Sequence, residues 1–416
     1  MRNRSSSISI GFAAMLWLLP GAPPADAQGL PTTLQEAKRL DGADELPATA
    51  FYSAPVSLAR SRPGDLLRKE SFSGYSLPPN TKAVRILYHS LDGAGRDVVT
   101  SGVVLVPAGT PPPGGWPVIA WAHGTSGVAR PCAPSLMKDV YYGALGLSAM
   151  LRAGFAIVAT DYHGLGTAGA HQYLDLDAQA RDVIFSVPAA RRAVPSLGSR
   201  WVVDGHSQGG ATAWRVATLE SSMRDPDYLG AVSVSGSAFF RKLISHFNQS
   251  AGGSFYLTYI AYGIHARYPA FEPAAMLTRR ALHGYRQATT QGCWYIGYAL
   301  YAHVPEGTML KADWQANPWV RRYLRQARVG TVRLRDPILV LAGEADHTVP
   351  FAGERRIAAR ACRIGSLVDF KGYPGLDHDQ TMARSVPDQL RWIRDRFAGK
   401  PAAATCAAMD WARSVR

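Results

Sequence analysis

Eight short apolar runs alternate with helix-length segments along most of the chain, and this alternation constrains the fold more than any other feature. The runs lie at residues 83–89, 98–106, 118–122, 155–160, 201–204, 231–234, 337–342 and 366–370. From the third onward they are continuously apolar, which is typical of strands buried on both faces of a parallel sheet. Helix-length segments separate them at 141–152, 175–192, 209–220 and 351–361. The pattern predicts an α/β fold with a mostly parallel, doubly wound sheet of eight strands and helices on both faces.

The spacing between the runs identifies a hairpin and an insertion. A short polar turn at 92–95 joins the first two runs, which predicts an antiparallel hairpin. Between the sixth and seventh runs lie 99 residues, 237–335, far more than a crossover helix needs. This segment holds 17 aromatic residues. We expect a helical cap whose aromatic side chains either fill its own core or hold an apolar ligand.

The first 27 residues have the features of a secretory signal peptide. Arg2 and Arg4 precede an apolar run at 8–19, and Ala25-Asp26-Ala27 forms an A-x-A cleavage site. The apolar run is 12 residues long, shorter than the roughly 20 that span a bilayer, so we expect a removed signal rather than an anchor. No later stretch is long and apolar enough to span a membrane. The sequence therefore predicts a secreted or periplasmic protein.

These expectations divide the chain into four segments. Residues 1–27 are the signal peptide, and 28–236 are the first part of the core with an N-terminal extension. Residues 237–335 are the cap or lid insertion, and 336–416 are the second part of the core with a C-terminal tail.

Composition and charge exclude several classes of protein. Hydrophobic residues make up 47% of the chain and charged residues 18%, which is an ordinary globular composition. The 45 basic residues exceed the 31 acidic ones, but they form no run longer than two. Nucleic-acid binding normally needs basic residues clustered in tails or stripes, so we expect no nucleic-acid partner.

Four cysteines are expected to form two disulfides: Cys132, Cys293, Cys362 and Cys406. An even number in an exported chain favours disulfides, and the spacings match no C-x-x-C metal or redox motif. Three pairings are possible. We favour Cys132 with Cys293, which would tie a core loop to the insertion, and Cys362 with Cys406, which would tie down the tail.

A G-x-S-x-G motif at 205–209 supplies a candidate nucleophile, Ser207. The pattern alone has little specificity. Its context has more, because a predicted strand at 201–204 precedes it and a predicted helix at 210–220 follows it. That strand–turn–helix arrangement is the nucleophile elbow of hydrolases.

A serine hydroxyl needs a histidine to take its proton and a carboxylate to orient that histidine. Asp346 follows the seventh predicted strand in the loop 343–350, and His378 follows the eighth in the loop 375–379. Nucleophile, acid and base then occur in the order of the α/β-hydrolase fold, at the carboxyl edge of the sheet. We expect Asp346 to be the acid and His378 the base.

Several neighbouring residues compete for these roles. Glu344 could serve as the acid but lies nearer the end of the strand. His347 adjoins the favoured acid and is expected to be a packing or surface residue. His206 is expected to point away from the nucleophile as a structural histidine, and Asp377 and Asp379 are expected to shape the loop of the base.

The tetrahedral intermediate of ester cleavage needs two amide donors for its oxyanion. The backbone N–H of Gln208 is one candidate. The other comes from the loop after the third predicted strand, where His123-Gly124 is typical of lipases and esterases. We favour the N–H of Thr125, with that of Gly124 as the alternative, and expect His123 and Gly124 to border the substrate.

No cofactor or metal is predicted. The chain has no P-loop and no G-x-G-x-x-G at a strand-to-helix turn. The triplet at 161–163, Asp-Tyr-His, has ligand-type residues but no matching cluster at metal-site spacing.

With these motifs in place, the sequence resembles the secretory lipase family of the α/β-hydrolase superfamily over roughly residues 51–397. The resemblance is carried by residues 51–55, 63–68, 123–125, 161–167 and 205–210 and by the loops of Asp346 and His378. It implies a carboxylic ester hydrolase with a helical cap between strands six and seven, acting on acylglycerols or other apolar esters. It also implies that Tyr162 and residues 164–166, including Gly164, line or support the pocket.

We therefore expect an exported serine esterase or lipase, active in lipid degradation, that works through an acyl-enzyme on Ser207 without a cofactor. Its partners would be ester substrates and, transiently, a lipid interface. A serine peptidase of the same fold is one alternative, and a non-catalytic binding module on a hydrolase scaffold is another.

Overall fold

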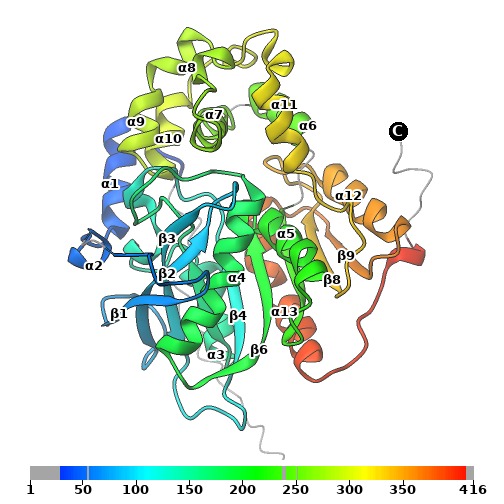
Figure 1. Cartoon of the computed structure of the whole chain (residues 1–416). Helices are drawn as coiled ribbons and strands as arrows, with labels where there is room; N and C mark the ends of the chain where they lie inside the picture. The colour runs from blue at the N-terminus through cyan, green and yellow to red at the C-terminus, as the bar shows by residue number, and fades with distance from the viewer. Residues whose placement is uncertain (1–28, 54–55, 237–239, 251, 409–416) are drawn as a thin grey trace, which may run out of the picture. The chain divides into compact units, whose positions relative to one another are not determined.

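Nine strands form one sheet in the described part of the chain, in the order β1-β2-β3-β5-β4-β6-β7-β8-β9 (Figure 1). The computed structural model describes residues 29–408 except 54–55, 237–239 and 251, so the predicted signal peptide lies outside the described residues. The strands are β1 (Leu66–Phe72), β2 (Lys82–Leu91), β3 (Asp97–Val106), β4 (Trp116–Ala122), β5 (Ala156–Thr160), β6 (Leu197–His206), β7 (Tyr228–Val234), β8 (Ile338–Gly343) and β9 (Val368–Tyr373).

The sheet is antiparallel at one edge and parallel elsewhere. Strands β1, β2 and β3 pair antiparallel, and β3 also pairs antiparallel with β5. From β5 to β9 every neighbouring pair is parallel. The predicted α/β class and the predicted hairpin at 92–95 are confirmed, since β2 and β3 pair up to Leu91 opposite Asp97.

The predicted strand number was one too low, because β1 was missed. Its sequence, LLRKESF, holds three charged residues and none of its side chains is fully buried. A half-exposed edge strand of this kind has no continuous apolar run, so the pattern that identified the other strands is absent.

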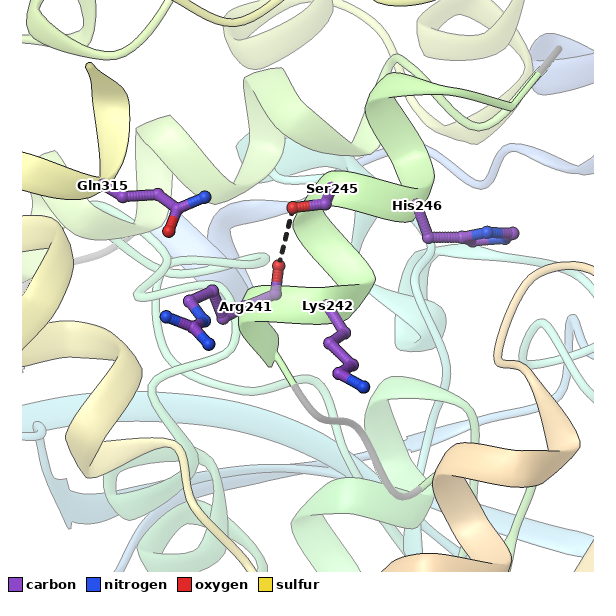
Figure 2. Close-up of a pocket in the computed structure, with 5 residues that line it drawn as sticks. All are labelled: Arg241, Lys242, Ser245, His246 and Gln315. Atoms are coloured by element: carbon purple, nitrogen blue, oxygen red, sulfur yellow. Dashed lines mark hydrogen bonds between the residues drawn. The ribbon is translucent and has the colours of Figure 1, made fainter. Parts of the chain in front are cut away.

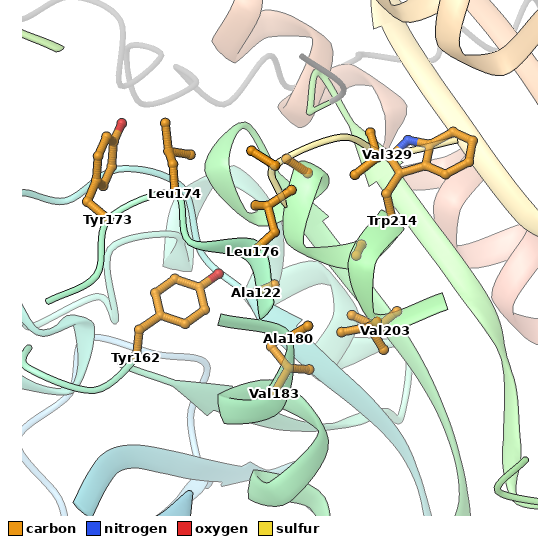
Figure 3. Packing of buried hydrophobic residues seen from close by; sticks show 14 of the residues in the cluster. Ala122, Tyr162, Tyr173, Leu174, Leu176, Ala180, Val183, Val203, Trp214 and Val329 are labelled. Atoms are coloured by element: carbon orange, nitrogen blue, oxygen red, sulfur yellow. The ribbon is translucent and has the colours of Figure 1, made fainter. Parts of the chain in front are cut away.

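Helices cover both faces of the sheet, which explains the continuous apolar runs. Alternate residues of β4 belong to different cores: Val118 and Ala120 pack on one face, and Ile119 and Trp121 on the other. The first face carries α4 (Leu176–Ala193) and α5 (Gln208–Met223), whose buried side chains Figure 3 shows in part. It also carries α12 (Phe351–Arg363). The second carries α3 (Ser148–Arg152) and α13 (His378–Phe397). Each fully buried aliphatic side chain contributes about 1.5–3 kcal/mol to folding.

Three of the four predicted helices match α4, α5 and α12 closely, and the fourth begins late. The segment predicted as a helix from 141 has positive φ at Val140 and Tyr141, φ values of 56° and 65°. A helix cannot begin there, so a π-helical turn, η4 (Gly143–Leu147), comes first and α3 follows it. The remaining short helical turns are η2 (Arg130–Cys132), η3 (Pro134–Leu136), η5 (Pro273–Ala275), η6 (Trp314–Ala316) and η7 (Cys406–Ala408).

Helices fill the segment between β7 and β8, as expected for a cap. They are α6 (Phe240–Asn248), α7 (Tyr256–Arg267), α8 (Arg279–His283), α9 (Tyr285–Thr290), α10 (Trp294–Tyr301) and α11 (Pro318–Gln326), and they gather at one end of the sheet (Figure 1). Many of the aromatic residues form the core of this segment. Phe255 and Tyr259 are buried, and the rings of Trp294 and Tyr298 stack 5.5 Å apart.

Two disulfides and an N-terminal helix hold these parts in place. Cys132 pairs with Cys293 and Cys362 with Cys406, which is the pairing that the sequence analysis favours. The N-terminal region forms α1 (Leu34–Asp44) and α2 (Ala50–Ser53). Asp41 of α1 accepts backbone hydrogen bonds from Cys293, Tyr295 and Ile296 at the start of α10, at 3.1–3.3 Å. A carboxylate at a helix N-terminus satisfies amides that have no partner within the helix.

None of the helices in the described ranges is both long enough and apolar enough to cross a bilayer.

Candidate active site

Ser207 lies at a sharp turn between β6, which ends at His206, and α5, which begins at Gln208. Its backbone has φ 56° and ψ −119°, a conformation that costs a non-glycine residue of order 1–3 kcal/mol. The Ser207 N–H donates to the carbonyl of Val234 in β7 at 2.9 Å, which helps to hold the turn. The geometry is that of the nucleophile elbow predicted from the motif.

The two glycines of the motif are required by crowding at the turn. A Cβ on Gly209 would overlap the carbonyl oxygen of Ala122 at the end of β4. A Cβ on Gly205 would overlap the carbonyl of Gly209 itself. The absence of these side chains lets α5 pack directly against the carboxyl ends of the central strands.

The structure brings together the predicted acid and base. Nδ1 of His378 lies 2.7 Å from Oδ2 of Asp346, while Oδ1 of Asp346 accepts the backbone N–H groups of Thr348 and Val349 at 2.8 and 2.7 Å. Because an ionised carboxylate can only accept, Nδ1 of His378 carries the hydrogen and Nε2 is left to take a proton. This is the tautomer that a general base requires.

The surroundings shift the pKa values of His378 and Asp346 in opposite directions. Burial lowers the pKa of His378, but Asp346, Asp379 and Asp377 outweigh it, and the pKa ends above its usual value. Burial raises the pKa of Asp346, but His378 and the amides of the acid loop outweigh it, and the pKa ends below its usual value. The carboxylate of Asp346 therefore favours its ionised form, and its charge favours a protonated His378 ring.

The structure corrects the expected setting of the base. His378 is the first residue of α13 rather than a loop residue, and Asp377 caps that helix by accepting the N–H of Gln380 at 2.9 Å. The sequence Asp-His-Asp-Gln at 377–380 has the capping-box spacing of a helix start. The prediction missed this signal because it treated the residues after the eighth strand as a loop. Asp379 is exposed on the first turn.

The competing residues have other positions. Glu344 is exposed, and so is His347, whose carbonyl accepts a hydrogen bond from His246 of α6 at 2.6 Å. His206 does not simply point away from the site. Its ring centroid lies 4.5 Å from that of His378, and Nε2 lies 3.2 Å from the His378 carbonyl oxygen.

Tyr142 is a residue of this site that sequence reasoning missed. Its hydroxyl lies 2.8 Å from Nδ1 of His206, and both side chains are buried. Burial, and then the nearby His378, lower the pKa of His206 to about 4, so its ring is neutral. Because Nε2 must donate to the His378 carbonyl, Nδ1 accepts from the Tyr142 hydroxyl. Nothing in the local sequence of Tyr142 connects it with a residue 64 positions away.

The loop after β4 lies beside the elbow. Thr125 is buried; its hydroxyl lies 2.8 Å from that of Tyr173, and its carbonyl accepts the Tyr141 hydroxyl at 2.6 Å. Gly124 is close to the carbonyl of His206 and has no room for a Cβ beside the Tyr142 hydroxyl. These contacts fix the backbone that would present the Thr125 or Gly124 amide to an oxyanion.

The side chains of His123 and Tyr162 are buried and hydrogen-bond to the backbone of this loop, so they support the loop rather than border an open pocket. Nδ1 of His123 lies 2.6 Å from the Gly124 carbonyl and Nε2 lies 3.2 Å from that of Asp161, and burial lowers its pKa to about 4. Tyr162 is fully buried, and its hydroxyl donates to the His123 carbonyl at 3.1 Å. Gly164 is packed against the backbone of His171.

The N–H of Gln208 belongs to the first turn of α5, where amides have no partner within the helix and the helix dipole favours negative charge. That is the setting that an oxyanion donor needs. The side chain of Gln208 is buried and lies 3.4 Å from Nε2 of His171.

Two groups of side chains have metal-ligand chemistry. In the 161–163 triplet, Asp161 accepts hydrogen bonds from Ser101 and Ser135, and His163 pairs with Asp182 at 2.9 Å, so both have structural partners. His206, His378 and Asp379 place ligand-type atoms within 4.8 Å of one another. In that group both Nδ1 atoms are hydrogen-bonded and Asp379 is exposed, so its geometry serves the acid–base pair and we assign it no ion.

Comparison with solved structures places the fold among lipases and esterases. Candida antarctica lipase A matches with a TM-score of 0.74 at 15% identity, over 87% of this chain and 89% of that one. The rice cell wall degrading esterase LipA from Xanthomonas oryzae, in a ligand-bound form, matches with a TM-score of 0.64 at 18% identity, over 82% and 100%. At identities this low, the similarity shows a shared fold and nothing more specific.

Sequence comparison is more specific. A Mycobacterium tuberculosis protein described as a probable inactive lipase, MT1628, is 24% identical over 373 residues, which are 84% of this chain and 82% of that protein. The secreted triacylglycerol lipase LIP7 of Malassezia globosa is 35% identical over 72 residues, 17% of this chain and 15% of that one. The family model described as secretory lipase matches residues 136–405. Because that match covers well over half of the 416 residues, the chain belongs to the secretory lipase family.

Proposed function

We propose that this protein is an exported serine hydrolase that cleaves apolar carboxylic esters, including acylglycerols, with Ser207, His378 and Asp346 as its catalytic triad. The observation that carries the proposal is the hydrogen bond between Nδ1 of His378 and the Asp346 carboxylate, beside an elbow that presents Ser207. The family and the fold support an ester hydrolase. The His378–Asp346 pair supplies a base that could take the proton of the Ser207 hydroxyl.

Acylation begins when Nε2 of His378 takes the Ser207 proton and Oγ of Ser207 forms a bond to the ester carbonyl carbon. The carbonyl oxygen becomes an oxyanion, which the amides of Gln208 and Thr125 stabilise. The bond to the leaving alcohol then breaks, and His378 returns its proton to the alcohol oxygen. Asp346 remains ionised and stabilises the imidazolium throughout.

Deacylation repeats these steps with water. His378 takes a proton from water, the hydroxide adds to the acyl carbon, and the bond to Oγ breaks as the proton returns to Ser207. The residues perform both halves of the cycle without a cofactor.

Similarity to known proteins does not establish whether this protein is catalytically active, so we infer activity from the residues of the site. The mycobacterial relative is described as a probable inactive lipase, so sequence similarity over most of the chain does not establish ester hydrolysis. In this chain Ser207 lies at a strand–helix turn, His378 hydrogen-bonds to Asp346, and Gly124 packs beside the turn. These parts favour a working enzyme over a non-catalytic scaffold.

Two disulfides and membership of the secretory lipase family support export. Disulfides persist in oxidising compartments outside the cytoplasm. The 72-residue match to a triacylglycerol lipase supports apolar ester substrates.

The test is a set of initial rates on p-nitrophenyl esters with acyl chains from acetate to palmitate, with Ser207→Ala as the blank. We expect turnover by the native protein and none by Ser207→Ala, whose circular dichroism should be unchanged. Rates that rise toward long chains and emulsified triacylglycerol indicate a lipase, and a preference for short chains indicates an esterase of small substrates. Turnover of aminoacyl anilides in place of esters would instead identify a peptidase.

A further inference from the structure

The positive charge of this chain is concentrated in the cap. Residues 237–335 hold 13 Lys and Arg against three Asp and Glu, a net charge of +10, whereas the whole chain carries +14. The cap is about a quarter of the sequence, so the rest of the chain is close to electrically balanced. The basic residues occur singly or in pairs along this segment, and they are densest at 321–335, which holds six arginines and no acidic residue.

The fold gathers part of this charge on two helices, α6 and α11. Arg241 and Lys242 are exposed at the start of α6. Arg321, Arg322 and Arg325 are exposed on α11, while Val320 and Tyr323 of the same helix are buried. We call the five exposed cations the basic face: Arg241, Lys242, Arg321, Arg322 and Arg325.

A cavity of about 570 Å³ adjoins this face (Figure 2). It is lined by Arg241, Lys242, Ser245, His246 and Gln315, with no carboxylate among them. Gln315 belongs to η6, which ends two residues before α11 begins, and it lies on the opposite side of the cavity from the α6 residues (Figure 2). The cavity therefore lies between α6 and the turn that leads into α11.

Acidic side chains do not neutralise the basic face. Among the described residues of the cap, ion pairs join Arg267 to Asp175 and Arg335 to Asp336, and neither arginine belongs to this face. Arg322 lies over the ring of Tyr268, 5.2 Å from its centroid, a contact that leaves its charge in place. The face therefore attracts anions over about a Debye length, ~8–10 Å at physiological salt.

The chemistry of the surface indicates attraction by charge rather than insertion of apolar groups. Val332 is the one strongly exposed large aliphatic side chain in the described part of the cap. A face of lysine and arginine side chains suits a surface of anionic headgroups, whose phosphates accept hydrogen bonds from guanidinium groups.

We propose that the basic face docks the enzyme on anionic lipid surfaces and so delivers it to ester substrates held there. This inference rests on the proposed function, because it names the form in which the substrate is presented. Docking through α6 and α11 places the cap against the lipid, at the end of the sheet where the cap helices gather (Figure 1).

The test measures binding of full-length Ser207→Ala protein, which leaves the lipid intact, to vesicles of phosphatidylcholine with or without 30% phosphatidylglycerol. We expect binding to the anionic vesicles, little to the neutral ones, and loss of binding in high salt. Reversing Lys242, Arg321 and Arg325 to Glu should weaken anionic-vesicle binding by about tenfold or more.

A matched control carries the same change in net charge elsewhere. Arg152, Arg384 and Arg394 are exposed on α3 and α13, and reversing these three to Glu should weaken binding by less than about twofold. Equal loss in both variants, or equal binding to neutral and anionic vesicles, would overturn the proposal. Binding to a DNA oligonucleotide but not to vesicles would overturn it in favour of a nucleic-acid surface.

Hydrolysis of a soluble ester by the same variants distinguishes a failure of lipid docking from a failure of catalysis. In the background with Ser207 intact, both triple variants should hydrolyse soluble p-nitrophenyl acetate at the native rate, since none of the changed residues lies in the acid–base site. An absence of turnover in the native protein contradicts the proposed function, whereas normal turnover with unchanged vesicle binding contradicts only the docking surface.

Discussion

His206 holds the backbone of His378: Nε2 of the first lies 3.2 Å from the carbonyl oxygen of the second, and their ring centroids are 4.5 Å apart. The residue before the proposed nucleophile thus contacts the proposed base. Since Tyr142 hydrogen-bonds to Nδ1, the His206 ring is held from both sides. We therefore expect His206 to be a positioning residue that helps to hold His378 at the start of α13.

Replacing His206 with Phe should lower kcat by about ten- to a hundredfold and leave KM nearly unchanged. The ring contact is retained but the support of the His378 carbonyl is lost, and small displacements of a catalytic group have effects of this size. Steady-state kinetics on a soluble ester measures it. His206→Gln, which keeps a donor, should recover part of the loss, and Tyr142→Phe should have a smaller effect. A change confined to KM argues against this role.

Asp346→Asn should lower kcat by roughly a thousandfold or more, because the amide no longer enforces the Nδ1–H tautomer of His378 or stabilises its cation. Glu344→Gln provides the matched control, since this side chain is exposed two residues away and should be dispensable. The kinetic comparison of the two variants identifies the acid. The opposite ranking would transfer the role to Glu344.

The rate should depend on the ionisation of His378. The neutral imidazole is the active base, so kcat/KM falls as pH drops through its pKa. That pKa is raised by Asp346, Asp379 and Asp377 despite burial, which places the acidic limb of the profile at a higher pH than an unperturbed imidazole would give. Asp379→Asn removes one of these charges and should move the limb to lower pH by a few tenths of a unit. A limb that stays in place in this variant contradicts the assignment of His378.

The two disulfides should differ in their contribution to stability. Cys132–Cys293 closes a separation of 161 residues and Cys362–Cys406 one of 44. Longer loops lose more entropy in the unfolded chain, so the paired Ser variants should lose about 2–5 kcal/mol each, with the larger loss for Cys132/Cys293. Chemical denaturation measures both. A larger loss for Cys362/Cys406 would show that strain or unfolded-state structure outweighs loop length.

The sequence predicted those parts of the site that local pattern determines. The central strands, the elbow at Ser207 and the order of Asp346 and His378 follow from buried runs and from a motif with strict backbone demands. The half-polar strand β1 and the helical start at His378 were missed, because each departs from the pattern used to find the rest. The contact of Tyr142 with His206 depends on how distant segments pack, which no local pattern records.

Crowding at the elbow gives a further prediction about Gly209. A Cβ there would overlap the Ala122 carbonyl, so Gly209→Ala should prevent folding or abolish soluble expression. Gly42 offers the control, because it lies in helix α1 with open space around it. Gly42→Ala should be neutral or stabilise by up to about 1 kcal/mol. A soluble, fully stable Gly209→Ala protein would show that the turn is looser than described.

The most direct test of the proposed mechanism is covalent labelling with a fluorophosphonate, followed by peptide mass spectrometry. We expect one adduct per chain, on Ser207, with ester hydrolysis lost in proportion to labelling, and no adduct on the Ser207→Ala protein. Labelling of a different serine, or ester hydrolysis that persists in a fully labelled or Ser207→Ala protein, would contradict the assignment of Ser207 as the nucleophile.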